Sequence, residues 1–166
     1  ELKYFVIFVG NNRSGTSLVG SFLNAHPNII CAHEFNLLKR RKLSPGTSRN
    51  QHFLHLINFA YTKNCKSYHH KRAHKIFGQP KDSWNRNIQV LGDKKSAATM
   101  TMMEKWISKQ SFESELNLLQ NFLNVPIKFI QLCRNPFDVI TSKTINFAHL
   151  GYDQKSSMKQ YFRHHD

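Results

Sequence analysis

Apolar and polar residues alternate along the chain in blocks that predict strands followed by helices. Four runs rich in Val, Ile, Leu and Phe have the length and composition of buried strands, and they cover residues 5–9, 28–32, 88–92 and 127–133. Apolar residues recur at helical spacing in residues 16–25, 52–61, 97–123 and 155–162, and another helix begins at 135–136. Strands that alternate with helices form a mostly parallel sheet with helices on its faces. The pattern therefore predicts an α/β fold of three layers.

Two connections depart from this alternation. Residues 39–50 are predicted to be a basic, turn-rich connection, and residues 62–87 are the least regular part of the chain. The long helical pattern at 97–123 is predicted to break near Gln110-Ser111 into two helices. The buried stripe of the first helix is predicted to consist of Leu18, Val19, Phe22 and Leu23.

The segment that joins the first strand to the first helix has the composition of an anion-binding loop. It breaks from the strand at Gly10, turns through small polar residues to Gly15, and enters a helical pattern at Thr16. Backbone N–H groups and the positive end of the helix dipole converge at such a helix N-terminus. The glycine spacing is that of the Walker A motif, but Thr16 stands at the lysine position and Arg13 places a cation inside the loop. This arrangement suits a phosphosulfate group, which needs no metal, better than a nucleoside triphosphate.

A second strand–turn–helix segment carries another set of anion ligands. Arg134 follows the fourth strand, Pro136 suits the first turn of a helix, and Ser142 lies eight residues after Arg134. An arginine at a strand end offers a bidentate fork to a phosphate, and Ser142 can add a hydroxyl hydrogen bond from two helical turns further on. The alternative interpretation is an ordinary strand–turn–helix in which Arg134 pairs with Asp138.

Residues 5–18 and 129–142 resemble the two cofactor-binding segments of sulfotransferases that use 3′-phosphoadenosine 5′-phosphosulfate (PAPS). The R-S-G-T-[ST]-L loop is similar to that of carbohydrate- and protein-directed members and of many bacterial ones. The resemblance implies a P-loop-like fold, PAPS as co-substrate, no metal, and motifs on opposite sides of the sheet, one for each end of the nucleotide. It assigns the 3′-phosphate to Arg134 and Ser142. It assigns the 5′-phosphosulfate to Asn12, Arg13, Ser14, Gly15, Thr16 and Ser17.

The resemblance also indicates which residues carry the chemistry of sulfonate transfer. Glu34, just past the second strand, resembles the base of several carbohydrate- and protein-directed sulfotransferases, and His33 is the alternative base. Arg13 is expected to bind the sulfonate and to stabilise charge on the leaving phosphate. Lys94 or Lys95 is expected to touch cofactor or acceptor, and strand alternation predicts that the two lysines face opposite ways. In the alternative interpretation, Glu34 only caps the following helix.

The net charge of +14, from 24 Lys and Arg against 10 Asp and Glu, indicates an anionic partner. The expected acceptor is a hydroxyl or amine of a glycan or other biomolecule, with an anionic glycan as one candidate, and no specific nucleic acid is expected. Two other functions stay open: a P-loop kinase or NTPase, against which the missing Walker lysine argues, and a non-catalytic binder of acidic polymers. His70 and His74 in the histidine-rich stretch 65–74 have metal-like spacing, but the surrounding cations argue against a metal.

The length of 166 residues is enough for one domain with a core, and no apolar run approaches about 18 residues, so no membrane span is expected. Residues 1–166 are thus predicted to form a single sulfotransferase-like domain. The chain ends soon after Ser142, whereas the family continues into further nucleotide contacts. This predicts either the N-terminal, cofactor-binding part of a longer enzyme or a degenerate copy that binds poorly. The expected compartment is the cytoplasm for a bacterial protein and the Golgi lumen for a trimmed eukaryotic one, and the oligomeric state stays open.

Overall fold

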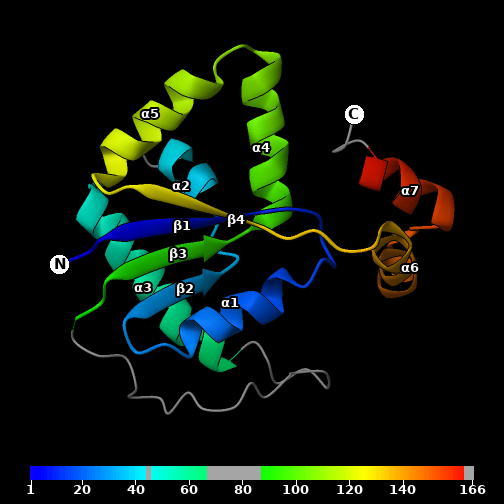
Figure 1. The fold of residues 1–166 in the computed structure, drawn as a ribbon, viewed down its shortest axis with the longest axis horizontal. Helices are drawn as coiled ribbons and strands as arrows, with labels where there is room; N and C mark the ends of the chain where they lie inside the picture. The colour runs from blue at the N-terminus through cyan, green and yellow to red at the C-terminus, as the bar shows by residue number, and fades with distance from the viewer. Residues whose placement is uncertain (44–45, 67–86, 163–166) are drawn as a thin grey trace.

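The computed structural model describes residues 1–43, 46–66 and 87–162. Four strands within these ranges form one parallel sheet with the order β2-β3-β1-β4 (Figure 1). Their bounds are Tyr4–Val9 for β1, Ile29–His33 for β2, Val90–Lys94 for β3 and Ile127–Gln131 for β4. The predicted α/β fold, with a central parallel sheet between helices, is confirmed.

Helices follow the strands, as the alternation predicts. Those in the described ranges are α1 (Thr16–Asn24), α2 (Leu37–Leu43), α3 (Arg49–Lys66), α4 (Ser96–Ser108), α5 (Phe112–Leu123), α6 (Pro136–Phe147) and α7 (Gln154–Phe162), and a 3₁₀ turn covers Ala148–Leu150. The predicted break between α4 and α5 is confirmed. Gln110 has a φ of 52°, a left-handed conformation that ends the first of the two helices. None of these helices combines the length and the hydropathy needed to cross a membrane.

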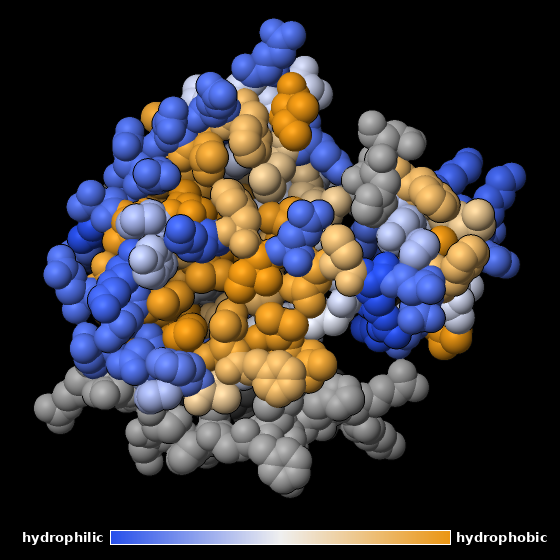
Figure 2. All heavy atoms as spheres, viewed as in Figure 1, coloured by the Kyte–Doolittle hydropathy of each residue, from blue (hydrophilic) through white to orange (hydrophobic). Residues whose placement is uncertain are grey.

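The two faces of the sheet pack against different helices, which makes three layers. Alternate residues of a strand point to opposite faces. Phe5 and Ile7 of β1 lie in the larger core, whose other members come from β2, β3, α2, α3, α4 and α5 and include Phe35 in the turn before α2. Val6 and Phe8 lie in a smaller core on the other face, against α1. Figure 2 shows apolar side chains gathered over the sheet between α1 and α4, with hydrophilic side chains around them.

The buried face of α1 differs from the predicted stripe. Leu18 and Phe22 are 44% and 60% exposed, whereas Gly20 and Asn24 are buried. The Asn24 side chain donates to the Cys31 carbonyl and accepts from the Cys31 N–H, both at 2.7 Å, so it ties the end of the helix to β2. Val19 and Leu23 do pack against the smaller core, so the predicted stripe is right for these two residues and wrong for Leu18 and Phe22.

The prediction of a turn-rich connection at 39–50 is wrong in part. Helix α2 lies there, and α3 begins at Arg49 and extends to Lys66, beyond the predicted 52–61. Leu37 and Leu38 bury α2 in the core. α3 begins with a capping box, in which Ser48 Oγ accepts from Gln51 N at 3.3 Å and Gln51 Oε1 accepts from Ser48 N at 2.8 Å. Residues 67–86, with His70 and His74, lie outside the described residues.

Strand β3 runs two residues later than the predicted 88–92. Gly92 continues the strand instead of ending it, because it lies between Val6 of β1 and Cys31 of β2 in the sheet. A Cβ atom at this position would lie 3.1 Å from the Val6 carbonyl oxygen. The shift matters for the site, because it places Lys94 inside the strand. Strand β4 ends at Gln131, two residues before the predicted end.

Helix α6 begins as predicted, with Pro136 as its first residue. The Asn135 side chain accepts a hydrogen bond from Phe137 N at 2.9 Å and caps the helix. α6 packs against α7, where Thr144 Oγ1 donates to Ser157 Oγ at 3.1 Å. Figure 1 shows this pair beyond the carboxyl ends of the strands, on the side to which the loop after β1 also leads.

Candidate active site

The loop between β1 and α1 has the backbone of an anion-binding turn. Gly10, Arg13 and Gly15 all have positive φ values, of 140°, 72° and 98°. A Cβ atom at Gly10 would lie 3.0 Å from the Leu132 carbonyl oxygen, so the loop packs directly on the end of β4. Ser14 Oγ donates to the Asn11 carbonyl at 2.7 Å and closes the turn. The loop is thus fixed in shape, with α1 starting at its end.

The predicted residues at the start of α1 differ in exposure. Asn12 and Arg13 are exposed, whereas Ser14 and Thr16 are buried. Thr16 Oγ1 accepts from Ser96 Oγ at 3.4 Å and so connects α1 to α4. A Cβ atom at Gly15 would meet no other atom within 4 Å, so the space in front of this part of the loop is open.

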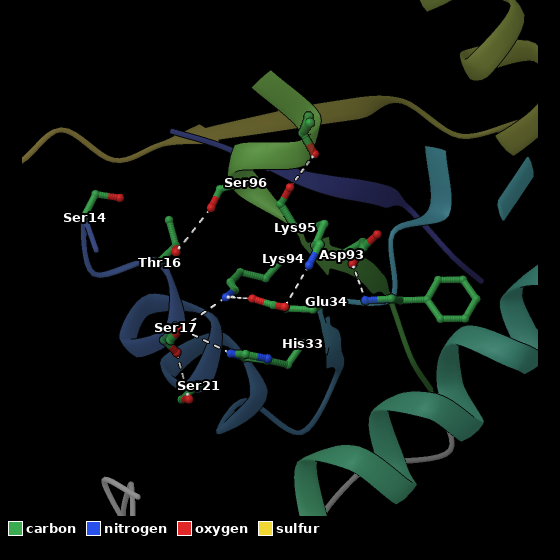
Figure 3. A network of polar contacts seen from close by, with 12 residues as sticks. Ser14, Thr16, Ser17, Ser21, His33, Glu34, Asp93, Lys94, Lys95 and Ser96 are labelled. Carbon is green, nitrogen blue, oxygen red and sulfur yellow. Dashed lines mark hydrogen bonds and ion pairs between the residues drawn. The ribbon is translucent and has the colours of Figure 1, made fainter. Parts of the chain in front are cut away.

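A cluster of charged side chains lies beside Ser17, at the carboxyl ends of β2 and β3 (Figure 3). Lys94 Nζ lies 3.1 Å from Ser17 Oγ and 3.2 Å from Glu34 Oε1. Lys95 Nζ lies 2.8 Å from Glu34 Oε2. His33 Nε2 lies 3.2 Å from Ser17 Oγ. The structure therefore brings both candidate bases and both candidate lysines to the first turn of α1.

The two lysines meet on one carboxylate, although alternation predicted that they face opposite ways. Lys94 is the inner one: its side chain is 6% exposed, against 32% for Lys95. Lys95 follows the last residue of β3 and has a φ of −128° and a ψ of 50°, so it no longer obeys strand alternation. A long side chain then suffices to bring its ammonium group back to Glu34.

Burial and charge set the protonation of the cluster. Burial on its own raises the pKa of Glu34, but hydrogen bonds and charges from Lys95 and Lys94 outweigh it, so this pKa lies below its usual value. Burial and the charge of Lys94 lower the pKa of His33 to about 4. Burial also lowers the pKa of Lys94, although Glu34 opposes that change. At neutral pH Glu34 is therefore ionised and His33 neutral.

Asp93 belongs to the site and was not predicted. It is buried below Glu34 and accepts backbone hydrogen bonds from Phe35 N at 3.1 Å and Leu37 N at 2.7 Å. Asp93 therefore accepts the first N–H group of α2, whereas the Glu34 carboxylate contacts Lys94 and Lys95. The available signal was an acidic residue directly after an apolar strand, next to two lysines.

The two motifs follow neighbouring strands and touch, which corrects the expectation that they lie on opposite sides of the sheet. β4 pairs directly with β1. Arg134 Nη1 donates to the Arg13 carbonyl at 3.2 Å, and Arg13 Nε donates to Ser142 Oγ at 2.9 Å. Arg134 Nε also lies 3.4 Å from Asp138 Oδ2, the pairing that the alternative interpretation proposed. A pocket between the motifs is lined by Gly10, Asn11, Ser14, Arg134, Val139 and Tyr161.

The cations that contact the candidate base are the two lysines, and the Arg13 guanidinium lies at the second motif. The Arg13 guanidinium contacts Ser142, in the second motif, and Glu34 is held by Lys94 and Lys95. Arg13 was expected at the sulfonate, and that role stays a prediction.

A family model described as the sulfotransferase domain matches residues 5–165, almost the whole chain. The chain belongs to the sulfotransferase family. No match to a curated protein is found. Membership makes this protein a sulfotransferase enzyme whose chemistry is the transfer of a sulfonate group. Of the functions that the sequence left open, the kinase or NTPase and the non-catalytic binder are thereby set aside.

This sulfotransferase places cations, hydroxyl groups and a carboxylate around one helix N-terminus. Members of the family typically use PAPS, whose two ends are anionic. Within residues 1–43, 46–66 and 87–162, no group of three or more His, Cys, Asp and Glu side chains is arranged to hold a metal ion. Arg13, Lys94, Lys95 and Arg134 are cations that the fold brings to the two loops after β1 and β4 and to the carboxyl ends of β2 and β3.

Proposed function

We propose that the protein transfers the sulfonate of PAPS to a hydroxyl or amine group of an acceptor, with Glu34 as the base. The observation that carries the proposal is the position of the Glu34 carboxylate. Lys94 Nζ contacts both this carboxylate and Ser17 Oγ. Ser17 lies in the first turn of the anion-binding helix, so a single ammonium group separates the base from that turn. A base, a cation and an anion-binding loop therefore share one location.

The residues of the loop fit the 5′-phosphosulfate end of the nucleotide. Ser14, Gly15, Thr16 and Ser17 surround the start of α1, where backbone N–H groups and hydroxyls can bind sulfonate and phosphate oxygens. The absence of a side chain at Gly15, and the open space in front of it, leave room for these groups. Asn12 is exposed beside them and is proposed to contact the same end.

The second motif fits the 3′-phosphate. Arg134 and Ser142 both lie against Arg13, so three donor-bearing side chains gather next to the pocket between the motifs. A guanidinium group is suited to bind two phosphate oxygens at once. The proposal therefore assigns Arg134 and Ser142 to the 3′-phosphate and places Arg13 between the two ends of the nucleotide.

In the proposed reaction, Glu34 accepts the proton of the acceptor hydroxyl or amine. The acceptor oxygen or nitrogen forms a bond to sulfur, the bond from sulfur to the bridging phosphate oxygen breaks, and its electron pair stays on that phosphate. Lys94 stabilises the charge that develops there, together with Ser17 and the helix N-terminus. No metal is needed in this scheme, because the cations come from side chains.

The contact between Lys94 and Glu34 links binding to catalysis in this proposal. Both oxygens of Glu34 accept from ammonium groups, which keeps its pKa low and makes it a weak base. An anion bound at Ser17 competes with Glu34 for Lys94. When Lys94 turns to that anion, the pKa of Glu34 rises and its carboxylate becomes a better proton acceptor. His33 remains the alternative base of the proposal.

The acceptor is proposed to be anionic, with an acidic glycan as the first candidate. The chain carries a net charge of +14. Lys39 and Arg40 are exposed and lie in the helix that follows Glu34 in the chain. Exposed cations next to a base attract an acidic acceptor at low ionic strength.

Calorimetric titration with 3′-phosphoadenosine 5′-phosphate (PAP) in the presence of EDTA tests the nucleotide site. Binding is expected without magnesium, and Arg134→Ala is expected to weaken it about 10- to 100-fold, because a charged hydrogen bond contributes about 1.5–3 kcal/mol. Arg49→Ala is the matched control, since the Arg49 guanidinium contacts Asn50 and the Phe53 ring, far from the motifs in the sequence. Equal affinity of the Arg134→Ala variant and the wild type would refute the assignment of the second motif.

A further inference from the structure

The turn that carries Glu34 has an unfavourable backbone. Glu34 has a φ of 69° and Asn36 a φ of 63°, and Phe35 lies between them. Asparagine adopts this left-handed region more readily than most residues, whereas a glutamate persists there only where the surroundings hold it. The group that holds this turn therefore also determines where the Glu34 carboxylate lies.

Asp93 holds the turn from the interior of the sheet. Its Oδ1 accepts from Phe35 N at 3.1 Å, and its Oδ2 accepts from Leu37 N at 2.7 Å. The residue is 5% exposed, and it pairs in register with Ala32 of β2 and Ile7 of β1. Because β3 is an inner strand, the position of this carboxylate is fixed by hydrogen bonds on both sides.

Two further contacts brace the turn, but neither replaces Asp93. Glu34 N donates to the Lys94 carbonyl at 2.9 Å, which extends the pairing of β2 with β3 by one residue. On the outside, Arg40 Nε donates to the Phe35 carbonyl at 2.7 Å, and its guanidinium lies 4.5 Å from the centre of the Phe35 ring. These contacts leave the N–H groups of Phe35 and Leu37 to Asp93.

We propose that Asp93 is a positioning residue for sulfonate transfer, which fixes the strained turn 34–36 and so places the Glu34 carboxylate against Lys94 and Lys95. This role rests on the proposed function of Glu34 as the base. Asp93 itself is buried, and the hydrogen bonds described above join it to the turn rather than to the loop or the second motif. Replacing Asp93 should therefore change the position and the pKa of the Glu34 carboxylate and leave the affinity for the nucleotide unchanged.

The role requires the ionised form of Asp93. A carboxylate accepts both N–H groups at once, whereas a carboxylic acid has one oxygen occupied by its own proton. Burial raises the pKa of Asp93 to about 6, although the hydrogen bonds from Leu37 and Phe35 oppose the rise. Lys95, after the end of β3, and Cys31 of β2 interact with it electrostatically, and Lys94 and Glu34 lie nearby in the same cluster. Acidification through about pH 6 should therefore loosen the turn.

The test is an NMR titration of protein labelled with ¹³C at the glutamate carboxyl carbons, with the Glu34 signal assigned through Glu34→Gln. The variants are Asp93→Asn and, as a matched control, Asp153→Asn. Asp153 also accepts a backbone N–H at the start of a helix, from Ser156 at 2.7 Å, but it lies at the exposed start of α7. In the wild type the Glu34 signal should show its own step and a second step near pH 6, where Asp93 titrates.

In Asp93→Asn the second step should disappear, and the pKa of Glu34 should rise because its carboxylate leaves the lysines. Asp153→Asn should give the wild-type curve. In calorimetry, Asp93→Asn should bind PAP within about threefold of the wild type. With an acceptor in hand, kcat should fall about 100-fold at a nearly unchanged KM for PAPS, since misplacing a catalytic group by about 1 Å has an effect of this size.

A Glu34 titration curve that is the same in Asp93→Asn and in the wild type would overturn the proposal. Should Asp93→Asn not fold, the wild type decides, because a Glu34 signal that shows no step besides its own over the whole titration also overturns it. The outcome for the proposed function is separate. If PAP does not bind the wild type, the nucleotide assignment fails, whereas the titration still reports on the turn.

Discussion

Gly92 occupies a position where the sheet leaves no room for a side chain, and this gives the sharpest stability prediction. It lies in the inner strand β3, in register with Val6 on one side and Cys31 on the other. A Cβ atom built at Gly92 would lie 3.1 Å from the Val6 carbonyl oxygen, 3.3 Å from Val6 Cβ and 3.4 Å from Cys31 Sγ. The closest of these atoms belongs to the backbone, so it cannot move aside by a change of rotamer.

Gly92→Ala is therefore expected to lower the free energy of unfolding by about 1–3 kcal/mol, the usual effect of overpacking a core. For a chain of this length that corresponds to a fall in Tm of roughly 3–10 °C. The variant should also reduce sulfonate transfer, because Asp93 and Lys94 follow Gly92 directly in the strand. Urea and thermal unfolding, monitored by circular dichroism, measure the first effect.

Gly20→Ala is the matched control, since it adds the same methyl group to another buried glycine near Cys31. The new Cβ atom would lie 3.7 Å from Lys94 Cγ and 4.0 Å from Cys31 Sγ, which are ordinary contact distances. In the middle of α1, alanine should raise the free energy of unfolding by about 0.5–1 kcal/mol. The reasoning is refuted if Gly92→Ala unfolds at the same urea concentration as the wild type, or if the two variants change stability in the same direction.

Further predictions concern the two candidate bases. Glu34→Gln should slow transfer from radiolabelled PAPS to an acidic glycan about 10²- to 10⁴-fold, the usual contribution of a general base, with PAP affinity unchanged. His33→Gln should retain most of the activity, and the reverse pattern would assign the base to His33. His33 also makes stability depend on pH, because its folded pKa of about 4 lies below the ordinary 6.5, so the unfolded chain binds the proton first. The free energy of unfolding should therefore fall as pH drops from about 6.5 to 4, and urea unfolding of His33→Gln should lack this contribution.

Local patterns were sufficient for the architecture of the chain and not for its details. Alternation of strands and helices predicted a parallel sheet between helices, and Pro136 marked the start of α6 correctly. The pattern could not show that Gly92 continues β3, since only the neighbouring strands reveal that a glycine is needed there. It also placed Leu18 and Phe22 wrongly in the buried stripe of α1. The hydrogen bonds between Asn24 and β2 join residues across the fold, so the pattern along the helix does not reveal them.

In the candidate site, too, the sequence predicted which residues take part but not how they contact one another. Glu34, His33, Lys94 and Lys95 were placed at the carboxyl ends of their strands from the sequence, and the structure brings them together beside Ser17. The choice between the lysines could not be predicted, because it depends on a strand boundary that was wrong by two residues. The capping of α2 by Asp93 was missed for a similar reason: residues 35–37 and 93 are distant in sequence and meet only in the folded chain.

Under the proposed function, the two ends of the nucleotide displace contacts of different strength. Arg134 pairs with Asp138 at 3.4 Å, but the two side chains are 47% and 57% exposed, and such surface pairs contribute only about 0–1 kcal/mol. The 3′-phosphate can therefore replace Asp138 at little cost. At the other end, Lys94 is 6% exposed and lies 3.2 Å from Glu34, so drawing it to the leaving phosphate removes a charge that keeps the pKa of Glu34 low. The first exchange mainly provides affinity, and the second prepares the base, which explains why the same site needs both an exposed arginine and a buried lysine.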